Sequence, residues 1–151
     1  MKAYRIALTK YSDTSGEGAK QYGGRWNQPG LPAIYAAASL SAGLLERLTI
    51  DPELLSSERY LDYSVMEFSI SEELIFFPSL KELPNNWNEI PAAMASMEYG
   101  SKLIKNGVLC FAVPSVLDPT STNFVINPLS PDFKKIQHST YPLDLDKRIQ
   151  R

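Results

Sequence analysis

Apolar residues along the chain fall into short runs typical of β-strands, separated by polar and glycine-rich segments. These runs are rich in β-branched and aromatic residues, which favour extended backbone. A polar segment near the C-terminus, 141–146, is a further candidate for an edge strand. The runs themselves cover residues 3–8, 33–37, 60–70, 74–77, 108–113 and 123–127. The pattern therefore predicts at least five short strands.

Two segments show the spacing of amphipathic helices. The first follows Ser39, a good N-cap residue, extends to about residue 50, and repeats leucine on one face at Leu40, Leu44 and Leu48. The second begins at Pro91 and ends at Asn106 and Gly107, a typical C-cap pair. Strands and helices do not alternate regularly, so the predicted fold class is α+β, in a single domain over residues 1–151.

The segment 12–32 is rich in glycine and contains two prolines, which indicates irregular backbone with Arg25 near its centre. Its sequence GEGAKQYGGRW suggests a nucleotide-binding loop but fits neither common template. Gln21 occupies the third glycine position of G-x-G-x-x-G, and the Gly-Lys-Ser/Thr of a P-loop is absent. The chain also has no G-x-S-x-G motif, and a Ser-His-Asp triad would depend on His138 in the polar C-terminal region.

The composition argues against several classes of protein. Fifteen basic and seventeen acidic residues give a net charge of −2, without the basic excess of proteins that bind nucleic acid directly. One cysteine, Cys110, and one histidine cannot supply an internal disulfide or a typical zinc site, so we expect no metal. The sequence shows no signal peptide and no apolar run long enough for a membrane span, so we expect a cytoplasmic protein without membrane contact.

Five polar residues stand in apolar or glycine-rich surroundings and are the candidates for chemistry: Arg5, Arg25, Tyr35, Glu46 and Ser115. Each also has a structural interpretation, as a solvated arginine, a core tyrosine, a solvent-facing glutamate or a turn serine. An arginine among glycines, however, suits recognition of phosphate or carboxylate. Small or apolar residues flank Glu46 on its side of the predicted helix, as in a pocket wall. Asn123 and Asn127 are expected to serve turns.

The order of several short motifs resembles the RES domain family, named for its Arg, Glu and Ser, which supplies the toxin of bacterial RES-Xre toxin-antitoxin pairs. The resemblance extends over nearly the whole chain. It is carried by YRI, GGRWN (23–27), AIYAA (33–37), LLERL (44–48), VPS (113–115), NFVINPLSPDF (123–133) and LDLDKRI (143–149).

The resemblance implies a fold like that of ADP-ribosyltransferases, a split antiparallel β-sheet with flanking helices that cradles NAD. It implies an NAD-degrading enzyme that breaks the bond between nicotinamide and ribose. NAD is then a substrate and no cofactor is needed. The acceptor is water in a glycohydrolase or inorganic phosphate, as co-substrate, in an NAD phosphorylase. The implied partner is an Xre-type antitoxin with a helix-turn-helix domain.

By the resemblance, the catalytic residues are Arg25, Tyr35, Glu46 and Ser115. Arg5, Arg25 and Tyr35 are expected to bind NAD, the arginines through its diphosphate and the tyrosine through the nicotinamide ring. Nicotinamide departs as a neutral molecule, so the reaction needs no strong general acid. Glu46 would stabilise positive charge on the ribose, and Ser115 would bind the ribose or hold Glu46 in place.

The chain departs from the family pattern at Ser130, where many members have histidine, and at Lys147, where many have proline. Two alternatives stay open. One is an ADP-ribosyltransferase that modifies a macromolecule, and the other is a non-catalytic RES-like binding module.

Overall fold

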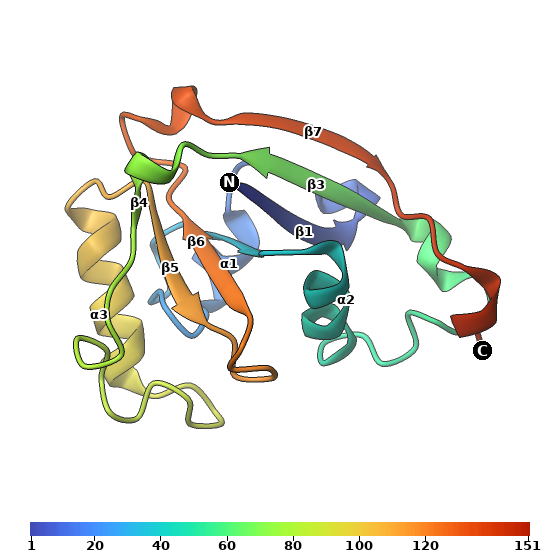
Figure 1. Ribbon diagram of the computed structural model, residues 1–151, viewed down its shortest axis with the longest axis horizontal. Helices are drawn as coiled ribbons and strands as arrows, with labels where there is room; N and C mark the ends of the chain where they lie inside the picture. The colour runs from blue at the N-terminus through green and yellow to red at the C-terminus, as the bar shows by residue number, and fades with distance from the viewer.

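The computed structural model describes residues 1–151, which form one seven-stranded sheet in the order β4-β5-β6-β2-β1-β3-β7 (Figure 1). All neighbouring strands are antiparallel except β4 and β5, which are parallel. The strands are β1 (Lys2–Leu8), β2 (Ile34–Ala37), β3 (Tyr63–Ser69), β4 (Ile75–Phe76), β5 (Cys110–Pro114), β6 (Thr122–Ile126) and β7 (Gln137–Pro142). The predicted α+β class is confirmed.

The sheet is divided between β1 and β2. These two strands share a single register pair, Tyr4 with Ala37, whereas β1 and β3 pair along the full length of both. One half of the sheet therefore consists of β4, β5, β6 and β2, and the other of β1, β3 and β7 (Figure 1). This division matches the split sheet that the family resemblance implies.

Three α-helices accompany the sheet: α1 (Glu17–Tyr22), α2 (Leu40–Leu48) and α3 (Met94–Lys105). None of them has the length and apolar character that crossing a membrane requires. In α2 the Ser39 hydroxyl accepts a hydrogen bond from the N–H of Ala42 at 3.1 Å, which confirms the predicted N-cap. The buried Gly43 brings α2 close to β1, since a Cβ there would lie 3.4 Å from the Tyr4 carbonyl oxygen.

Three predicted elements are corrected by the structure. The glycine-rich segment contains the short helix α1, which packs through Ala19 against the core around Trp26. Helix α3 begins at Met94, three residues after Pro91. The last strand, β7, covers Gln137–Pro142 instead of 141–146, because its pairing with β3 ends at Ser64 and Pro142.

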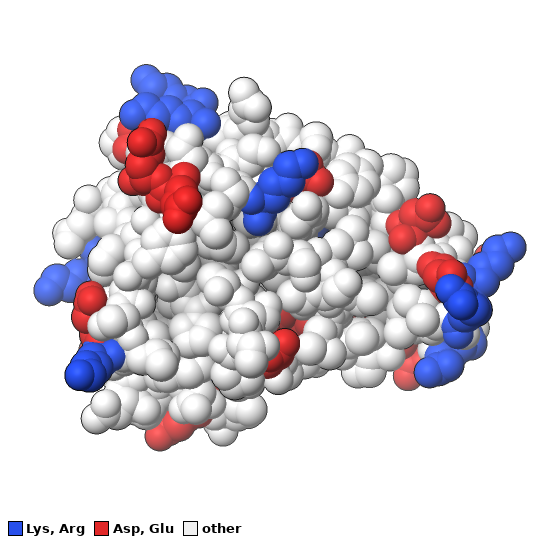
Figure 2. All heavy atoms as spheres, in the orientation of Figure 1, with Lys and Arg blue, Asp and Glu red and all other residues white.

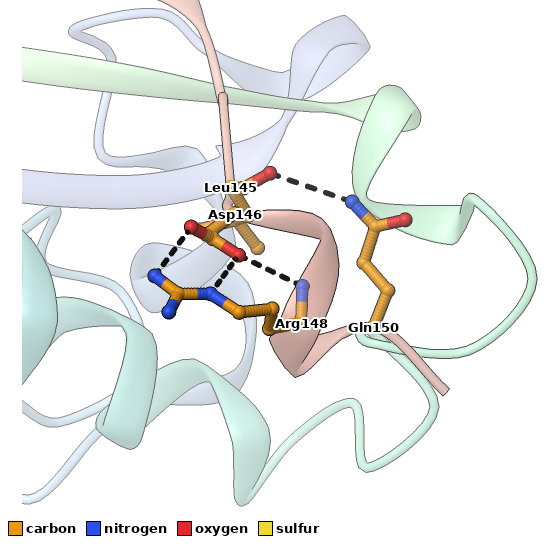
Figure 3. Close-up of polar contacts among 4 residues, drawn as sticks. All are labelled: Leu145, Asp146, Arg148 and Gln150. Atoms are coloured by element: carbon orange, nitrogen blue, oxygen red, sulfur yellow. Dashed lines mark hydrogen bonds and ion pairs between the residues drawn. The ribbon is translucent and has the colours of Figure 1, made fainter.

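Of the predicted strand 141–146, only residues 141 and 142 belong to β7, and a 3₁₀ turn, η5 (Lys147–Ile149), follows the predicted segment (Figure 3). Asp146 caps it by accepting hydrogen bonds from the N–H and the guanidinium of Arg148, at 2.8–2.9 Å, while Gln150 donates to the Leu145 carbonyl. The contacts between the Asp146 carboxylate and Arg148 therefore stabilise this turn locally. Lys147 is the first residue of this turn, a position that proline also suits because its N–H needs no partner within the turn.

A buried polar network fixes the end of α2 to β3. The Asp51 carboxylate accepts hydrogen bonds from the Tyr63 hydroxyl and, at 2.6 Å, from Nε of Arg59. The Arg47 guanidinium lies over the Tyr63 ring, 5.3 Å from its centre. The hydrogen bond from Tyr63, assisted by Arg59, holds the pKa of Asp51 below its usual range, although desolvation opposes the shift.

This network predicts that the free energy of unfolding decreases at acidic pH. A lowered pKa in the folded state means that ionised Asp51 stabilises the fold above its unfolded pKa, and that this contribution disappears as pH falls through the folded pKa. We expect the free energy of unfolding, measured with urea, to fall more steeply below about pH 4 in the wild type than in Asp51→Asn. Parallel curves for the two proteins would contradict this role of Asp51.

Candidate active site

Glu46 lies on the side of α2 next to the sheet, and one of its carboxylate oxygens is fixed there. Oε1 accepts hydrogen bonds from the Ser115 hydroxyl at 2.6 Å and from Nδ2 of Asn123 at 2.8 Å. Oε2 has no hydrogen-bond partner within the chain. The carboxylate is therefore anchored through one oxygen and offers the other to a ligand.

Ser115 uses all of its hydrogen-bonding capacity within the protein. It follows β5, and its hydroxyl donates to Glu46 while accepting from the N–H groups of Leu117, at 3.1 Å, and Asp118, at 3.2 Å. A hydroxyl has one donor and two acceptor sites, so none is left for a substrate. Of the two roles predicted for Ser115, the geometry favours holding Glu46.

Asn123, in β6, was expected to serve a turn, and this expectation is wrong. Its side chain donates to Glu46, and its own Oδ1 is buried without a partner. Asn127 does serve a turn, because its amide donates to the carbonyls of Ile104 and Val108 and its Oδ1 accepts from the N–H of Leu129. The sequence has the same residue type at both ends of NFVIN, and their roles differ because Asn123 lies within β6 beside α2, whereas Asn127 follows β6 next to the end of α3.

Arg25 stands at the corner of a tight turn. Gly24 and Asn27 close this turn with mutual backbone hydrogen bonds of 3.0 and 3.4 Å. The guanidinium of Arg25 donates through one nitrogen, Nη1, to the carbonyls of Trp87 at 2.8 Å and Glu89 at 2.7 Å. Nε and Nη2 make no hydrogen bonds within the chain. This edge of the guanidinium is free to bind an anion in a forked arrangement.

The Arg25 turn is held in place by the packing of its buried residue Trp26. Trp26 is 2% exposed and packs edge-on against Phe111 and Tyr99 and face-on against Trp87. Its carbonyl oxygen comes so close to α3 that a Cβ at Gly100 would lie only 1.9 Å away. The loop that holds the guanidinium, which contains Trp87, and the turn that carries Arg25 thus share one aromatic cluster.

Tyr35, in β2, anchors the same turn through its hydroxyl. That hydroxyl donates to Oδ1 of Asn27 at 2.6 Å and accepts from the N–H of Trp26 at 3.0 Å. It occupies the space next to Gly24, where a Cβ would lie 2.6 Å from the tyrosine oxygen. Burial of the hydroxyl raises the pKa of Tyr35 far above its usual value, so the residue is neutral. Since the hydroxyl is occupied, only the half-buried ring of Tyr35 is available to contact a ligand.

The two groups of residues lie on the same face of the sheet. Tyr35 pairs with Val125, and Ala37 pairs with Asn123, so Tyr35 and Asn123 project to one side. Burial lowers the pKa of Arg25, and the nearby carboxylate of Glu46 opposes that shift. Arg25, Tyr35, Glu46 and Ser115, predicted from positions far apart in the sequence, therefore lie on one side of the sheet, where Ser115 is hydrogen-bonded to Glu46 and Tyr35 to the turn that carries Arg25.

Arg5 lies apart from these residues. In β1 it pairs with Met66, whereas its neighbour Tyr4 pairs with Ala37, so Arg5 projects to the opposite face of the sheet from Asn123. Its Nη1 contacts the Tyr11 carbonyl and the Met66 sulfur, each at 3.2 Å, and burial lowers its pKa. The expected contact of Arg5 with a diphosphate remains a prediction, while its contacts with Tyr11 and Met66 indicate a structural role.

Positive charge is not concentrated on the face of the molecule that Figure 2 shows. On the face shown in Figure 2, Lys and Arg stand at separate places, most of them toward the outline and one in the upper middle of the face, and they form no continuous patch. A hollow of about 250 Å³ lies beside the turn between β5 and β6, lined in part by Phe77, Leu80, Val113 and Thr122, and none of the predicted site residues lines it.

Ser130 occupies a position where many members of the family have histidine. It is buried, and its hydroxyl donates to the Gly107 carbonyl at 2.9 Å, which ties the turn after β6 to the end of α3.

The anchoring role of Tyr35 predicts a change in stability that does not depend on catalysis. Tyr35→Phe leaves Oδ1 of Asn27 and the N–H of Trp26 buried without a partner, which we expect to lower the free energy of unfolding by about 1–3 kcal/mol. Tyr99→Phe is the control, because the Tyr99 hydroxyl makes no hydrogen bond in the structure. Equal urea-denaturation midpoints for the two variants would exclude the anchoring role.

Comparison with known proteins gives relatives of similar length. The chain is 35% identical to "Toxin Res" of Photorhabdus laumondii over 99% of its own length and 97% of that protein. It is 34% identical to "Toxin Res" of Yersinia enterocolitica, over 99% of this chain and all of the relative. It is also 35% identical to a "Prs ADP-ribosylating toxin" of a Sphingobium strain, over 83% of this chain and 78% of that protein.

A solved structure has the same fold. A chain in the crystal structure of the M. tuberculosis MbcT-MbcA toxin-antitoxin complex superimposes with a TM-score of 0.72, at 21% identity, over 94% of this chain and 83% of that one. The RES domain matches residues 2–146, which is nearly the whole chain. The resemblance predicted from the order of short motifs is confirmed, and the chain belongs to the RES domain family.

Proposed function

We propose that this chain is a toxin that depletes NAD by breaking the bond between nicotinamide and ribose. The proposal rests on one observation, the pairing of the Glu46 carboxylate with the Arg25 guanidinium at the site. A carboxylate anchored through Oε1, with Oε2 free, lies within electrostatic reach of a guanidinium whose free edge suits a phosphate group.

Glu46 supplies the charge that this reaction needs. As the bond to nicotinamide breaks, the ribose acquires positive charge, and a fixed carboxylate stabilises that charge without having to reorganise. Nicotinamide leaves as a neutral molecule, so a general acid is unnecessary. The free Oε2 can also accept a proton from the attacking acceptor, as the second carboxylate of a glycosidase does.

Arg25 binds the diphosphate in this proposal. Two main-chain carbonyls hold Nη1, and this leaves the edge formed by Nε and Nη2 in a fixed direction. Such a preorganised fork matches two phosphate oxygens. Tyr35 contributes its ring face to the nicotinamide, while its hydroxyl keeps the Arg25 turn in place.

The acceptor of the ADP-ribose group is water or inorganic phosphate in the main proposal. A second candidate is transfer to a macromolecule, which is favoured by the one-third identity with the Sphingobium protein named as an ADP-ribosylating toxin. A partner antitoxin of Xre type is proposed from the family resemblance, and the fold shared with a toxin-antitoxin complex supports a partner of this general class.

One experiment separates these reactions. Purified protein is incubated with NAD, with and without inorganic phosphate, and the products are identified by mass. Free nicotinamide with ADP-ribose indicates hydrolysis, a phosphorylated ADP-ribose indicates phosphorolysis, and an added ADP-ribose on protein or nucleic acid indicates transfer. Unchanged NAD under all conditions would overturn the proposal and favour a binding module.

Replacing the charge of Glu46 provides the first variant test. We expect Glu46→Gln to lower the turnover number for NAD at least about 100-fold, because one preorganised electrostatic group contributes roughly 3–4 kcal/mol to the transition state. Glu98→Gln, which alters an exposed glutamate on α3 without hydrogen bonds, should keep wild-type activity. More than a tenth of wild-type turnover in Glu46→Gln would exclude the assignment.

Replacing Arg25 tests binding instead of bond cleavage. A lysine has no planar fork, so we expect Arg25→Lys to raise KM for NAD roughly 10-fold to 100-fold, the effect of losing one charge-assisted hydrogen bond. Arg148→Lys, which changes an arginine at the exposed C-terminal turn, is the matched control and should leave KM unchanged. A wild-type KM in Arg25→Lys, determined from initial rates, would show that the diphosphate binds elsewhere.

A further inference from the structure

The half-buried Asn123 differs from the buried Asn27 and Asn127 in the hydrogen bonds of its side-chain amide. The buried side chain of Asn27 donates from Nδ2 to carbonyls and accepts at Oδ1, and Asn127 does the same. Asn123 donates to Glu46, but its Oδ1 is buried and has no donor. An unsatisfied buried carbonyl lowers stability, so this residue is a poor choice for stability alone.

The orientation of this amide is determined by Glu46. Turning the amide over would place its carbonyl oxygen against Oε1 of Glu46 and would break the 2.8 Å hydrogen bond. Nδ2 must therefore face the carboxylate, and Oδ1 must face the interior. The side chain is thus held in its orientation by one interaction, with the residue that the proposed reaction uses.

The two hydrogen bonds to Oε1 restrict the rotation of the Glu46 carboxylate. The terminal torsion of a glutamate is soft, so a carboxylate with one partner can exchange its two oxygens or swing. The Ser115 hydroxyl arrives from the segment after β5 and the Asn123 amide from β6, and both meet at Oε1. The two contacts together restrict that torsion and define Oε2 as the outward oxygen.

We infer that Asn123 is a positioning residue for NAD cleavage: with Ser115 it clamps Oε1 of Glu46, so that Oε2 faces the ribose of the substrate. This inference rests on the proposed function, because it assigns to Glu46 the role of the catalytic carboxylate. It adds a residue outside the Arg, Tyr, Glu and Ser set that the family resemblance supplied.

The test compares Asn123 with Asn127, which lie four residues apart and have different hydrogen-bond partners. A serine at position 123 is too short to reach Glu46, so we expect Asn123→Ser to lower kcat for nicotinamide release roughly 10-fold to 100-fold, the effect of one hydrogen bond to a charged group. KM for NAD should stay within about 3-fold of wild type, and the unfolding temperature should not fall. Asn127→Ser should behave in the opposite way, with a lower unfolding temperature and a normal kcat per folded molecule.

A second background isolates the route through Glu46. In Glu46→Gln, adding Asn123→Ser should change kcat by less than about 2-fold, because a residue that acts only through a carboxylate has no effect once that carboxylate is gone. Asn123→Asp, which keeps the shape but places a second carboxylate against Oε1, should lower kcat further than Asn123→Ser. It also keeps the test decisive if the serine variant does not fold.

The possible failures are distinct. A wild-type kcat in Asn123→Ser or Asn123→Asp, in a protein that does cleave NAD, overturns the positioning role and leaves the proposed function intact. A lower unfolding temperature with normal kcat assigns Asn123 to structure alone. Absence of nicotinamide release by the wild type overturns both the proposed function and this inference.

Discussion

The hydrogen bonds that Glu46 receives from Ser115 and Asn123 join the three parts of the molecule on which the rest of the site depends. Helix α2 has only nine residues, and it packs on β1 and β2 through leucines and the close approach at Gly43. The bonds at Oε1 attach this helix to β6 and to the segment after β5. A charge held by neutral donors from separate elements keeps its position only while the whole fold is intact.

Arg25 is held by the same principle with different chemistry. Its turn is fixed by the hydrogen bond to the Tyr35 hydroxyl and by the packing of Trp26, and its guanidinium is held by carbonyls of a loop distant in sequence. Both charged residues are therefore preorganised by contacts within the protein and do not depend on a ligand to order them. Fixed groups of this kind stabilise a developing charge better than mobile ones, because little reorganisation is needed during the reaction.

The residues that hold the site are more numerous than those that would carry the chemistry. Gly24 makes room for the Tyr35 oxygen, Asn27 ties the turn to α1 and to Leu31, and Gly100 allows α3 to approach Trp26. Such positions tolerate few substitutions for steric reasons alone.

Much of this protein was determined by local sequence. Apolar runs and leucine spacing predicted most strands and α2, and Ser39 predicted its start, because strand and helix periodicity and capping depend on neighbouring residues. The order of motifs predicted the family and four residues that do gather together. Local sequence did not determine α1, whose stability depends on packing against Trp26, or the position of β7, which is set by its pairing with β3. Nor could it separate Asn123 from Asn127 or place Arg5 on the opposite face. The two asparagines differ in the helix that packs beside each of them, and the side chain of Arg5 is placed by strand register; both are properties of the tertiary structure.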